Sequence, residues 1–496
     1  MSGIDLIRAG SPQGCRPWER HVLTIEQWSA LAATSTPPLA GMWADATHVH
    51  AAFHGDRELL VASVTVAGGQ YPALSPLRPP AAWFERMIRD LWGHAAKDAA
   101  DLRPWLDHGR WPVTSPLAAR PGPAHETTPQ PEFLPAEGES LHIVPVGPVH
   151  AGTIEPGHFR FHAQGETVVR LEARLGYVHK GLLGLMRGKS PRAAAALAAR
   201  ISGDSTVAHA TAFARAAEAA TGAQVPPRAH ALRAVMGEVE RIANHLNDIG
   251  FICNDAAFAA PHARTGYHRE MLMRAAYTAF GHRMMMDRVI PGGVSDDILP
   301  GGDTAILRTL AAIEDEWPTL MRVYDSYASL ADRVAGTGIT RPELVETFAA
   351  GGVVGRAAGR GFDARRDLVY PPYDDLLPGT PLRLEGDVDA RVRVRAEEVV
   401  VSMRLLRTLL ATLPEGPVAV PLPQAEGEGI GVVEGFRGDI LHWMRLDAGG
   451  LITACFARDP SWFHWPLLEA GIEGNIIADF PLFNKSMNGS YSGVDL

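Results

Sequence analysis

Two kinds of hydrophobic periodicity follow one another along the chain. Near the start, apolar and polar positions alternate over residues 47–53 and 58–66, a pattern typical of half-buried strands. Residues 81–91 instead carry apolar side chains at helical spacing, so a helix is expected there. The pattern therefore predicts a first domain of mixed α and β structure over residues 1–120.

A proline-rich segment interrupts the apolar pattern after this first part. Residues 120–140 contain five prolines and few apolar side chains, a composition typical of linkers. We therefore expect a linker over residues 121–142 and a second domain over residues 143–496.

The second domain begins with a strand pattern and then changes to helical periodicity. In residues 157–176, alternating positions flank a turn at residues 164–166, which predicts a β-hairpin. An alanine-rich helix is expected over residues 205–221, with Gly222 as its C-terminal cap. The next helix is expected to begin at Pro227, because proline is tolerated in the first turn of a helix.

The helix that begins at Pro227 carries a continuous apolar seam. Its apolar side chains recur at steps of three and four residues, at Leu232, Val235, Val239, Ile242, Leu246 and Ile249. Two more long helices are expected over residues 304–334 and 391–413, with β-structure near residues 439–456. The whole pattern predicts an α+β N-terminal domain followed by a mainly α-helical large domain with a β-hairpin at its start.

Composition and charge narrow the possible classes of function. The chain of 496 residues is 46% hydrophobic and 21% charged, which is ordinary for a globular protein. Its formal net charge of −10 and the lack of a long basic run argue against nucleic-acid binding. The N-terminus has no secretion signal pattern, and no apolar run approaches the length of about 20 residues that a membrane span needs. We therefore expect a chain that is soluble or peripheral on something else.

The cysteines are too few and too scattered for a thiolate metal centre. Cys15, Cys253 and Cys455 are the only three, and no two of them form a C-x-x-C motif. An iron–sulfur cluster or a thiolate nickel site needs about four thiolates. Neither can be built from this chain alone unless other ligand types substitute, and sparse cysteine also fits a reducing compartment.

Motifs for metal or nucleotide binding are weak. His158 and His162 fall in the alternating pattern of a strand, where they would lie roughly 13 Å apart, so a solvated strand face is the favoured interpretation. The chain has no H-E-x-x-H, no P-loop and no dinucleotide-binding fingerprint, so a nucleotide site is unsupported.

Two groups of polar residues leave a structural and a functional interpretation open. Glu238, Arg241 and His245 share one helix face beside the apolar seam. They form either an exposed ion pair or a polar stripe that points into a subunit interface or a cofactor vestibule. His150 and Glu155 lie in a Gly/Pro loop, where polar side chains serve either turn chemistry or function.

A series of short motifs in the second domain carries a family resemblance. In chain order they occupy residues 147–150, 176–181, 227–229, 238–246, 291–294, 352–359, 363–366, 370–373 and 437–439. The series resembles the large subunit shared by membrane-bound [NiFe] hydrogenases and the quinone-site subunit of respiratory complex I. The resemblance covers about residues 143–496 and is specific, because many motifs agree in order and spacing.

The N-terminal domain resembles the small partner subunit of the same complexes. The pattern is Glu85-Arg86-x-x-x-Asp90-x-x-Gly93, followed by residues 101–104. A chain in which the two subunits are fused is typical of the formate-hydrogenlyase and hydrogenase-4-like branch of the family.

The chain departs from the family at the positions that carry its chemistry. Where hydrogenases of the family have R-x-C-G-x-C, residues 200–205 place Ser202 and Ser205, and the C-terminal pair of cysteines falls at Ser490 and Gly493. Serine hydroxyls cannot replace soft thiolates at nickel, so nickel is not expected. The complex I branch has a quinone-binding tyrosine where this chain has Gly203.

The resemblance implies a cysteine-less subunit of a membrane-associated complex I-like or hydrogenase-related oxidoreductase, of the NADH:quinone oxidoreductase or hydrogenase type. Such a complex would pass electrons to quinone or another carrier and couple the transfer to ion translocation. The alternative is a non-catalytic coupling subunit. The implied partners are a small iron–sulfur subunit that holds the clusters and antiporter-like membrane subunits. The implied place is the cytoplasmic side, peripheral on the inner face of the membrane.

The resemblance also assigns candidate site residues, although no cofactor is expected to be held by this chain alone. His150, Glu155 and Arg356 are expected to form a pocket that handles protons or an acceptor such as quinone. The degenerate ligand positions and other candidate cofactor contacts are Ser202, Gly203, Ser205, Ser490, Gly493, His179, Arg241 and His245. No metal ligand is predicted.

Overall fold

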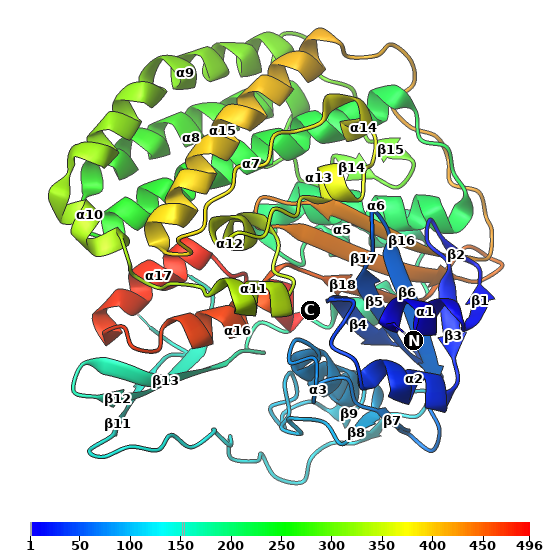
Figure 1. Ribbon diagram of the computed structural model, residues 1–496. Helices are drawn as coiled ribbons and strands as arrows, with labels where there is room; N and C mark the ends of the chain where they lie inside the picture. Colours follow the sequence, from blue (N-terminus) through cyan, green and yellow to red (C-terminus); the bar gives the residue numbers. More distant parts are fainter. Residues whose placement is uncertain (1, 151, 153) are drawn as a thin grey trace.

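A computed structural model describes residues 2–150, 152 and 154–496 of the chain. Figure 1 shows the N-terminal strands, in blue, beside strands from near the C-terminus, with a layer of long helices beyond them. None of the described helices combines the length and the apolar character needed to cross a bilayer.

The N-terminal part is built on a five-stranded sheet. Its strands lie in the order β1 (Ser11–Gln13), β3 (Arg20–Leu23), β6 (Leu59–Thr65), β5 (His48–His54) and β4 (Leu39–Ala44). The strands expected over residues 47–53 and 58–66 are β5 and β6, and the expected helix is α3 (Ala81–Trp92), so these three predictions are confirmed. Gly93 ends α3 in the left-handed conformation, with a φ of 74°.

A second sheet joins the two ends of the chain. It has the order β18 (Ile452–Arg458), β17 (Asp439–Leu446), β16 (Gly427–Glu434) and β2 (Cys15–Arg16). Strand β2 comes from the N-terminal part and pairs in parallel with β16, with Cys15 opposite Glu428. The expected β-structure near residues 439–456 is confirmed as β17 and β18, whereas β16 was not predicted.

Glycines in β16 allow a helix to approach the sheet at backbone distance. On α6 (Thr206–Thr221), the carbonyl oxygen of Ala216 would lie 2.1 Å from a Cβ added at Gly429. Gly427 and Gly431 face the helix in the same way, so larger residues in this row would push α6 away. Close packing of α6 on β16 therefore places residues 202–205, which immediately precede the helix, beside the sheet.

The predicted hairpin is confirmed and has a third strand. Strands β12 (His158–Gln164) and β13 (Thr167–Arg174) pair with each other, and β11 (His142–Val146) pairs with β12. His158 and His162 lie on β12, as the alternation predicted. Among the described residues between Lys97 and β11, the regular secondary structure consists of two short strands, β9 (Val113–Thr114) and β10 (Gly122–Pro123). The domain boundaries stay a prediction.

Long helices form the layer beyond the second sheet. Helix α7 (Pro227–Asp255) begins at Pro227 as predicted and buries the whole apolar seam. It packs against α8 (Ala259–Phe280), which was not predicted, and against α15 (Val388–Ala411), which was expected over residues 391–413. The helix expected over residues 304–334 is divided at Tyr327 into α9 (Gly302–Ser326) and α10 (Ala328–Val334).

Shorter elements complete the fold. Before the long helices they are α1 (Gly3–Arg8), α2 (Ile25–Ala32), β7 (Gln70–Pro72), β8 (Ala95–Lys97), α4 (Leu182–Met186), α5 (Pro191–Ala198) and the 3-10 turn η1 (Gly203–Ser205). Later ones are β14 (Val289–Ile290), β15 (Gly293–Val294), α11 (Pro342–Thr347), α12 (Gly352–Ala357), α13 (Ala364–Asp367), α14 (Tyr373–Leu376), α16 (Ser461–Gly471), η2 (Ile477–Asp479), α17 (Phe480–Met487) and α18 (Ser492–Asp495).

Candidate functional site

Serines that are 288 positions apart in the chain meet between α6 and α18. The Oγ atoms of Ser202 and Ser490 lie 2.8 Å apart, and both residues are buried. Ser202 Oγ also donates to Asp204 Oδ1 over 3.0 Å, so the Ser490 hydroxyl donates to Ser202. We use the name serine cluster for Ser202, Ser205, Ser490 and Ser492 together with Asp204 and Arg437.

Arg437 holds the η1 side of the serine cluster. It lies in the turn between β16 and β17 and donates to both carboxylate oxygens of Asp204, at 2.6 and 2.5 Å. It also donates to Ser205 Oγ over 3.0 Å. Burial raises the pKa of Asp204, but the Arg437 guanidinium outweighs this and the net effect lowers the pKa. The cluster therefore contains an ionised carboxylate with a fixed counter-charge.

The segment that follows α17 is fixed by its own hydrogen bonds. The backbone N–H of Ser490 donates to Ser461 Oγ over 2.8 Å, and the N–H of Gly493 donates to Ser490 Oγ over 3.0 Å. A Cβ added at Gly493 would lie 2.7 Å from Asp459 Cγ. Gly493 is therefore in close contact with Asp459, and position 493 has no room for a larger side chain.

A buried chain of ionisable groups extends from Asp459. Its Oδ2 lies 3.0 Å from His209 Nε2, and His209 Nδ1 lies 3.1 Å from His442 Nε2. The three side chains therefore form a continuous hydrogen-bonded chain from Asp459 through His209 to His442. Burial and then His209 hold the pKa of His442 well below its usual value. None of these three residues was predicted from the sequence, because no local motif marks them.

Glu155 and His150 lie on the other side of the C-terminal segment. Glu155 Oε2 accepts from the backbone N–H of Ser492 over 3.0 Å, which joins the predicted loop to the serine cluster. His150 Nδ1 accepts from the N–H of Gly152 over 3.2 Å. His150 Nε2 is buried and has no hydrogen-bond partner among the described residues.

His150 faces a cavity of about 460 Å³, which we name the His150 cavity. Its wall includes the aromatic rings of Phe159, Phe251 and Phe480 and the side chain of Tyr491. The Tyr491 hydroxyl is buried and lacks a hydrogen bond of good geometry to any described residue. The cavity also has a polar side with the following members: Asn254, Asp255, Asn484, Lys485 and Asn488. Aromatic walls with a few polar groups are typical of sites for small organic molecules. Sequence analysis did not single out Tyr491.

His179 and Gly203 were expected as candidate cofactor contacts, but the structure gives them other surroundings. The Nδ1 of His179 donates to the carbonyl oxygen of Asp495 over 2.6 Å, and the ring stacks on Trp111. His179 thus holds the C-terminal segment in place. Gly203 is exposed, and nothing lies within 4 Å of a Cβ added there. Position 203 therefore has room for a side chain.

Arg356, Arg241 and His245 belong to a separate buried ionic cluster. Arg356 donates to Glu398 and Glu434, and His245 Nε2 lies 2.7 Å from Glu398 Oε2. Arg241 donates to Glu238 and to the backbone carbonyls of residues 434 and 435. The interpretation of Glu238, Arg241 and His245 as an exposed pair is wrong, because their exposed fractions are 0%, 2% and 0%.

The structure brings together most, but not all, of the predicted site. Residues 202–205, Glu155 and residues 490–493 converge through hydrogen bonds. Arg356 lies apart, as Arg241 and His245 do, because its hydrogen bonds go to Glu398, Glu434 and the carbonyl of Phe362 and to no member of the serine cluster. Arg437, which was noted in a motif without a role, takes the place expected for Arg356.

The residues at the positions where the resemblance predicts nickel ligands do not fit nickel. Ser202 and Ser490 hydrogen-bond to each other, Ser205 accepts from Arg437, and Gly493 has no side chain. Neutral hydroxyls are poor ligands for a metal that selects thiolates in this site type. Across the described residues, no group of three or more His, Cys, Asp or Glu side chains could hold a metal ion. Burial raises the pKa of all three thiols, so they are not reactive thiolates.

Comparisons with known proteins show the family to which the chain is related. Residues 255–425 match the family model of the respiratory-chain NADH dehydrogenase 49 Kd subunit, and residues 180–248 match that of nickel-dependent hydrogenase. The fold and site thus define a large subunit of the hydrogenase and complex I type.

Curated relatives cover most of the chain. Formate hydrogenlyase subunit 5 of Escherichia coli is 31% identical over 86% of this chain and 77% of its own length. Hydrogenase-4 component G of Escherichia coli is 29% identical over 86% of this chain and 76% of its own length. An NADH-quinone oxidoreductase subunit of Bacteroides fragilis is 26% identical over 75% of this chain and 74% of its own length. The chain belongs to the family of these hydrogenase and complex I large subunits, which confirms the resemblance.

Proposed function

We propose that this chain is a subunit of a membrane-associated oxidoreductase complex that transfers electrons to an organic carrier such as quinone and couples the transfer to ion translocation. Family membership supports the class of complex. The His150 cavity carries the proposal of an organic acceptor. The hydrogen bond between Ser202 and Ser490 supports only the loss of nickel, because the two predicted ligand positions pair with each other. The electrons would come from iron–sulfur clusters in a small partner subunit, and antiporter-like subunits would anchor the complex on the inner face of the membrane.

The His150 cavity is the proposed place of the acceptor. A quinone headgroup is flat and apolar with two carbonyl oxygens, and it needs hydrogen-bond donors at its edge. His150 Nε2 and the Tyr491 hydroxyl supply two unsatisfied polar atoms beside aromatic rings. Two electrons from the partner and two protons convert a quinone to a quinol. Glu155 contacts the same segment through Ser492 and can hold one of these protons.

The purified complex offers a direct test. We expect a quinone analogue to bind the assembled complex and to bind at least tenfold more weakly after Tyr491→Phe. Tyr267→Phe on the exposed face of α8 is the matched control and should bind normally. Nickel analysis of the same sample should find far less than one nickel per chain. One nickel per chain, or equal binding in all variants, would contradict the proposal.

A second candidate is a non-catalytic subunit that couples a partner's redox change to the membrane arm. It is favoured by the serine cluster itself, in which Ser202, Ser205 and Ser490 are hydrogen-bonded without any ligand. Under this alternative, no quinone analogue binds, whereas assembly of the complex still requires the chain.

A further inference from the structure

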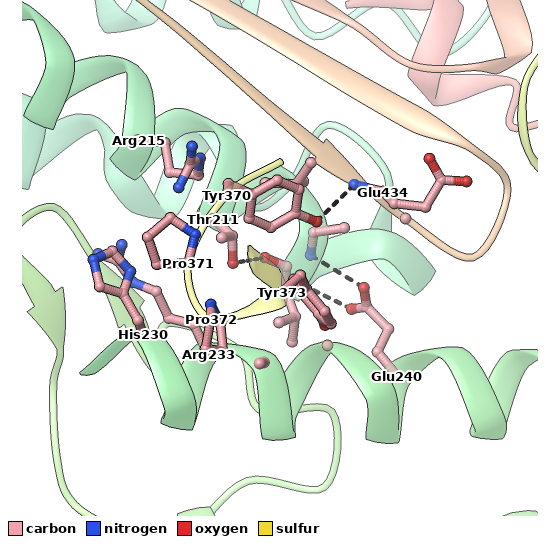
Figure 2. A pocket seen from close by; sticks show the side chains of 16 residues that line it. Thr211, Arg215, His230, Arg233, Glu240, Tyr370, Pro371, Pro372, Tyr373 and Glu434 are labelled. Atoms are coloured by element: carbon pink, nitrogen blue, oxygen red, sulfur yellow. Dashed lines mark hydrogen bonds between the residues drawn. The ribbon is translucent and has the colours of Figure 1, made fainter. Parts of the chain in front are cut away.

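A cavity with an unpaired arginine lies between α6, α7 and the segment that contains Tyr370. Figure 2 shows Arg215 and Tyr370 on one wall and His230, Arg233 and Glu240 along α7 on the other. Its volume of about 40 Å³ corresponds to room for about three water molecules. It is separate from the His150 cavity and shares no lining residue with it.

Arg215 has no carboxylate partner among the described residues. Its guanidinium carbon lies 4.6 Å from the ring centroid of Tyr370, so the aromatic ring covers one face of the cation. The Nε atom is buried without an acceptor. Stacking uses the face of a guanidinium and leaves its in-plane N–H groups free to hold a ligand.

The carboxylates around the cavity are already engaged elsewhere. Glu218 accepts from Arg233 and from the N–H of Gly292. Glu240 accepts from two backbone N–H groups at the start of α6, as the dashed lines in Figure 2 show. Glu434 accepts from Arg356 and from the N–H of Ala364. None of these three carboxylates hydrogen-bonds to Arg215, and Glu218 and Asp374 act on its charge only at longer range. The guanidinium therefore has no directly bonded carboxylate among the described residues.

Two further groups favour a negatively charged ligand or an acceptor. The Tyr370 oxygen accepts from the N–H of Glu434 over 3.0 Å, and no described residue accepts its hydrogen. Burial, with Arg233 and Arg215, lowers the pKa of His230 to about 4. The His230 ring is therefore neutral near pH 7 and can donate one N–H. Arg215 is half-buried, with its Nε atom fully buried. Removing part of a cation from water without a hydrogen-bond partner is costly, and a bound anion would offset that cost.

We propose that this cavity binds a small planar oxyanion of the carboxylate or bicarbonate class. The in-plane N–H groups of Arg215 would hold two of its oxygens side by side, as guanidinium groups hold carboxylates. The Tyr370 hydroxyl would donate to the same ligand. Three or four heavy atoms fill a space of about three waters, whereas tetrahedral sulfate and phosphate are too bulky. The site is independent of the proposed redox function.

Thermal unfolding of the full chain tests the site with defined probes. We expect potassium bicarbonate and potassium acetate to raise the unfolding temperature saturably, and potassium chloride at equal ionic strength not to do so. Arg215→Gln should weaken the apparent affinity at least tenfold. Arg264→Gln is the matched control, because Arg264 pairs with Glu316 on the exposed surface, and it should respond as the unmodified chain does.

A second variant keeps the test decisive if Arg215→Gln does not fold. Tyr370→Phe retains the ring beneath Arg215 and removes the hydroxyl donor, so binding should weaken about three- to tenfold. An equal response to chloride, or equal responses of the unmodified chain, Arg215→Gln and Tyr370→Phe to bicarbonate and acetate, would overturn the proposal. The outcome does not depend on quinone binding, so failure of one proposal is distinguishable from failure of the other.

Discussion

Ser202 Oγ and Ser490 Oγ lie 2.8 Å apart although 288 positions separate them in the chain. Each stands at a position where the family resemblance predicts a cysteine. The two serines lie together in space and hydrogen-bond to each other. Two segments that the motif order predicted to converge therefore do meet in the fold.

Because Gly493 is tightly packed and Gly203 is not, we expect substitution by alanine to lower the stability of the chain much more at Gly493 than at Gly203. Gly493→Ala should destabilise the chain by about 1–3 kcal/mol, because its Cβ would lie 2.7 Å from Asp459 Cγ. Gly203→Ala should change stability by less than about 0.5 kcal/mol, because nothing lies within 4 Å of its Cβ. Urea unfolding of the two variants measures both values, and similar values would contradict the close packing at Gly493.

The ion pair between Arg20 and Glu428 predicts strong coupling of the two ends of the chain. The pair is buried, with Arg20 Nε 2.7 Å from Glu428 Oε1. Glu428→Ala should therefore cost about 3–5 kcal/mol, because it leaves a buried guanidinium unpaired. Glu58→Ala removes the partner of Arg8 on the surface and should cost less than about 1 kcal/mol. Chemical denaturation compares the two, and a mild effect at Glu428 would argue against a shared core.

The buried carboxyl of Asp495 should make the folded chain less stable as the pH rises. Burial raises the pKa of its carboxyl from 3.8 to about 7, although the N–H groups of Gly176 and Val178 bind it. The folded chain therefore holds a proton that the unfolded chain has lost. The protonated Asp495 carboxyl therefore stabilises the folded chain fully below pH 3.8, and this stabilisation is lost as the pH rises towards 7. It amounts to at most about 4 kcal/mol.

Asp495→Asn should remove this pH dependence, because the amide stays neutral. Unfolding free energies at pH 5 and pH 8 should differ less in the variant than in the unmodified chain. Parallel pH profiles of the two proteins would show that Asp495 does not hold the proton.

Removing the titratable proton of Glu155 should lower the turnover of the complex without preventing its assembly. Glu155→Gln keeps an acceptor for the N–H of Ser492 and removes the titratable proton. We expect the assembled complex to lose at least tenfold in electron transfer or ion coupling, as removal of a general acid–base group does. Normal activity of Glu155→Gln and of His150→Ala in an intact complex would support the non-catalytic alternative.

The proline-rich segment predicts the first site of proteolysis. Residues 124–132 are exposed and lie outside helices and strands, and Glu126 falls within them. A glutamate-specific protease should therefore cut after Glu126 before it cuts inside α7. Mass spectrometry of early fragments measures the order, and first cleavage within α7 would contradict the predicted linker.

Local patterns were enough to predict many of the elements. The apolar seam of α7, the cap at Gly222 and the turn at residues 164–166 each depend on neighbours a few positions away. Periodicity and turn chemistry act over such short spans, so the sequence by itself determines these features. The positions of Ser202 and Ser490 followed from the order of the family's motifs.

Long-range packing determined the rest of the site. Helical spacing placed Glu238, Arg241 and His245 on one face, but only the tertiary structure shows that α12, α13 and α15 cover that face and bury it. Only the tertiary structure likewise shows that Arg437, and not Arg356, contacts the serine cluster. It also shows that Asp459, His209 and His442 form a hydrogen-bonded chain. A sequence pattern specifies which face of an element is polar, whereas the partner of that face is set by contacts between segments that are hundreds of residues apart.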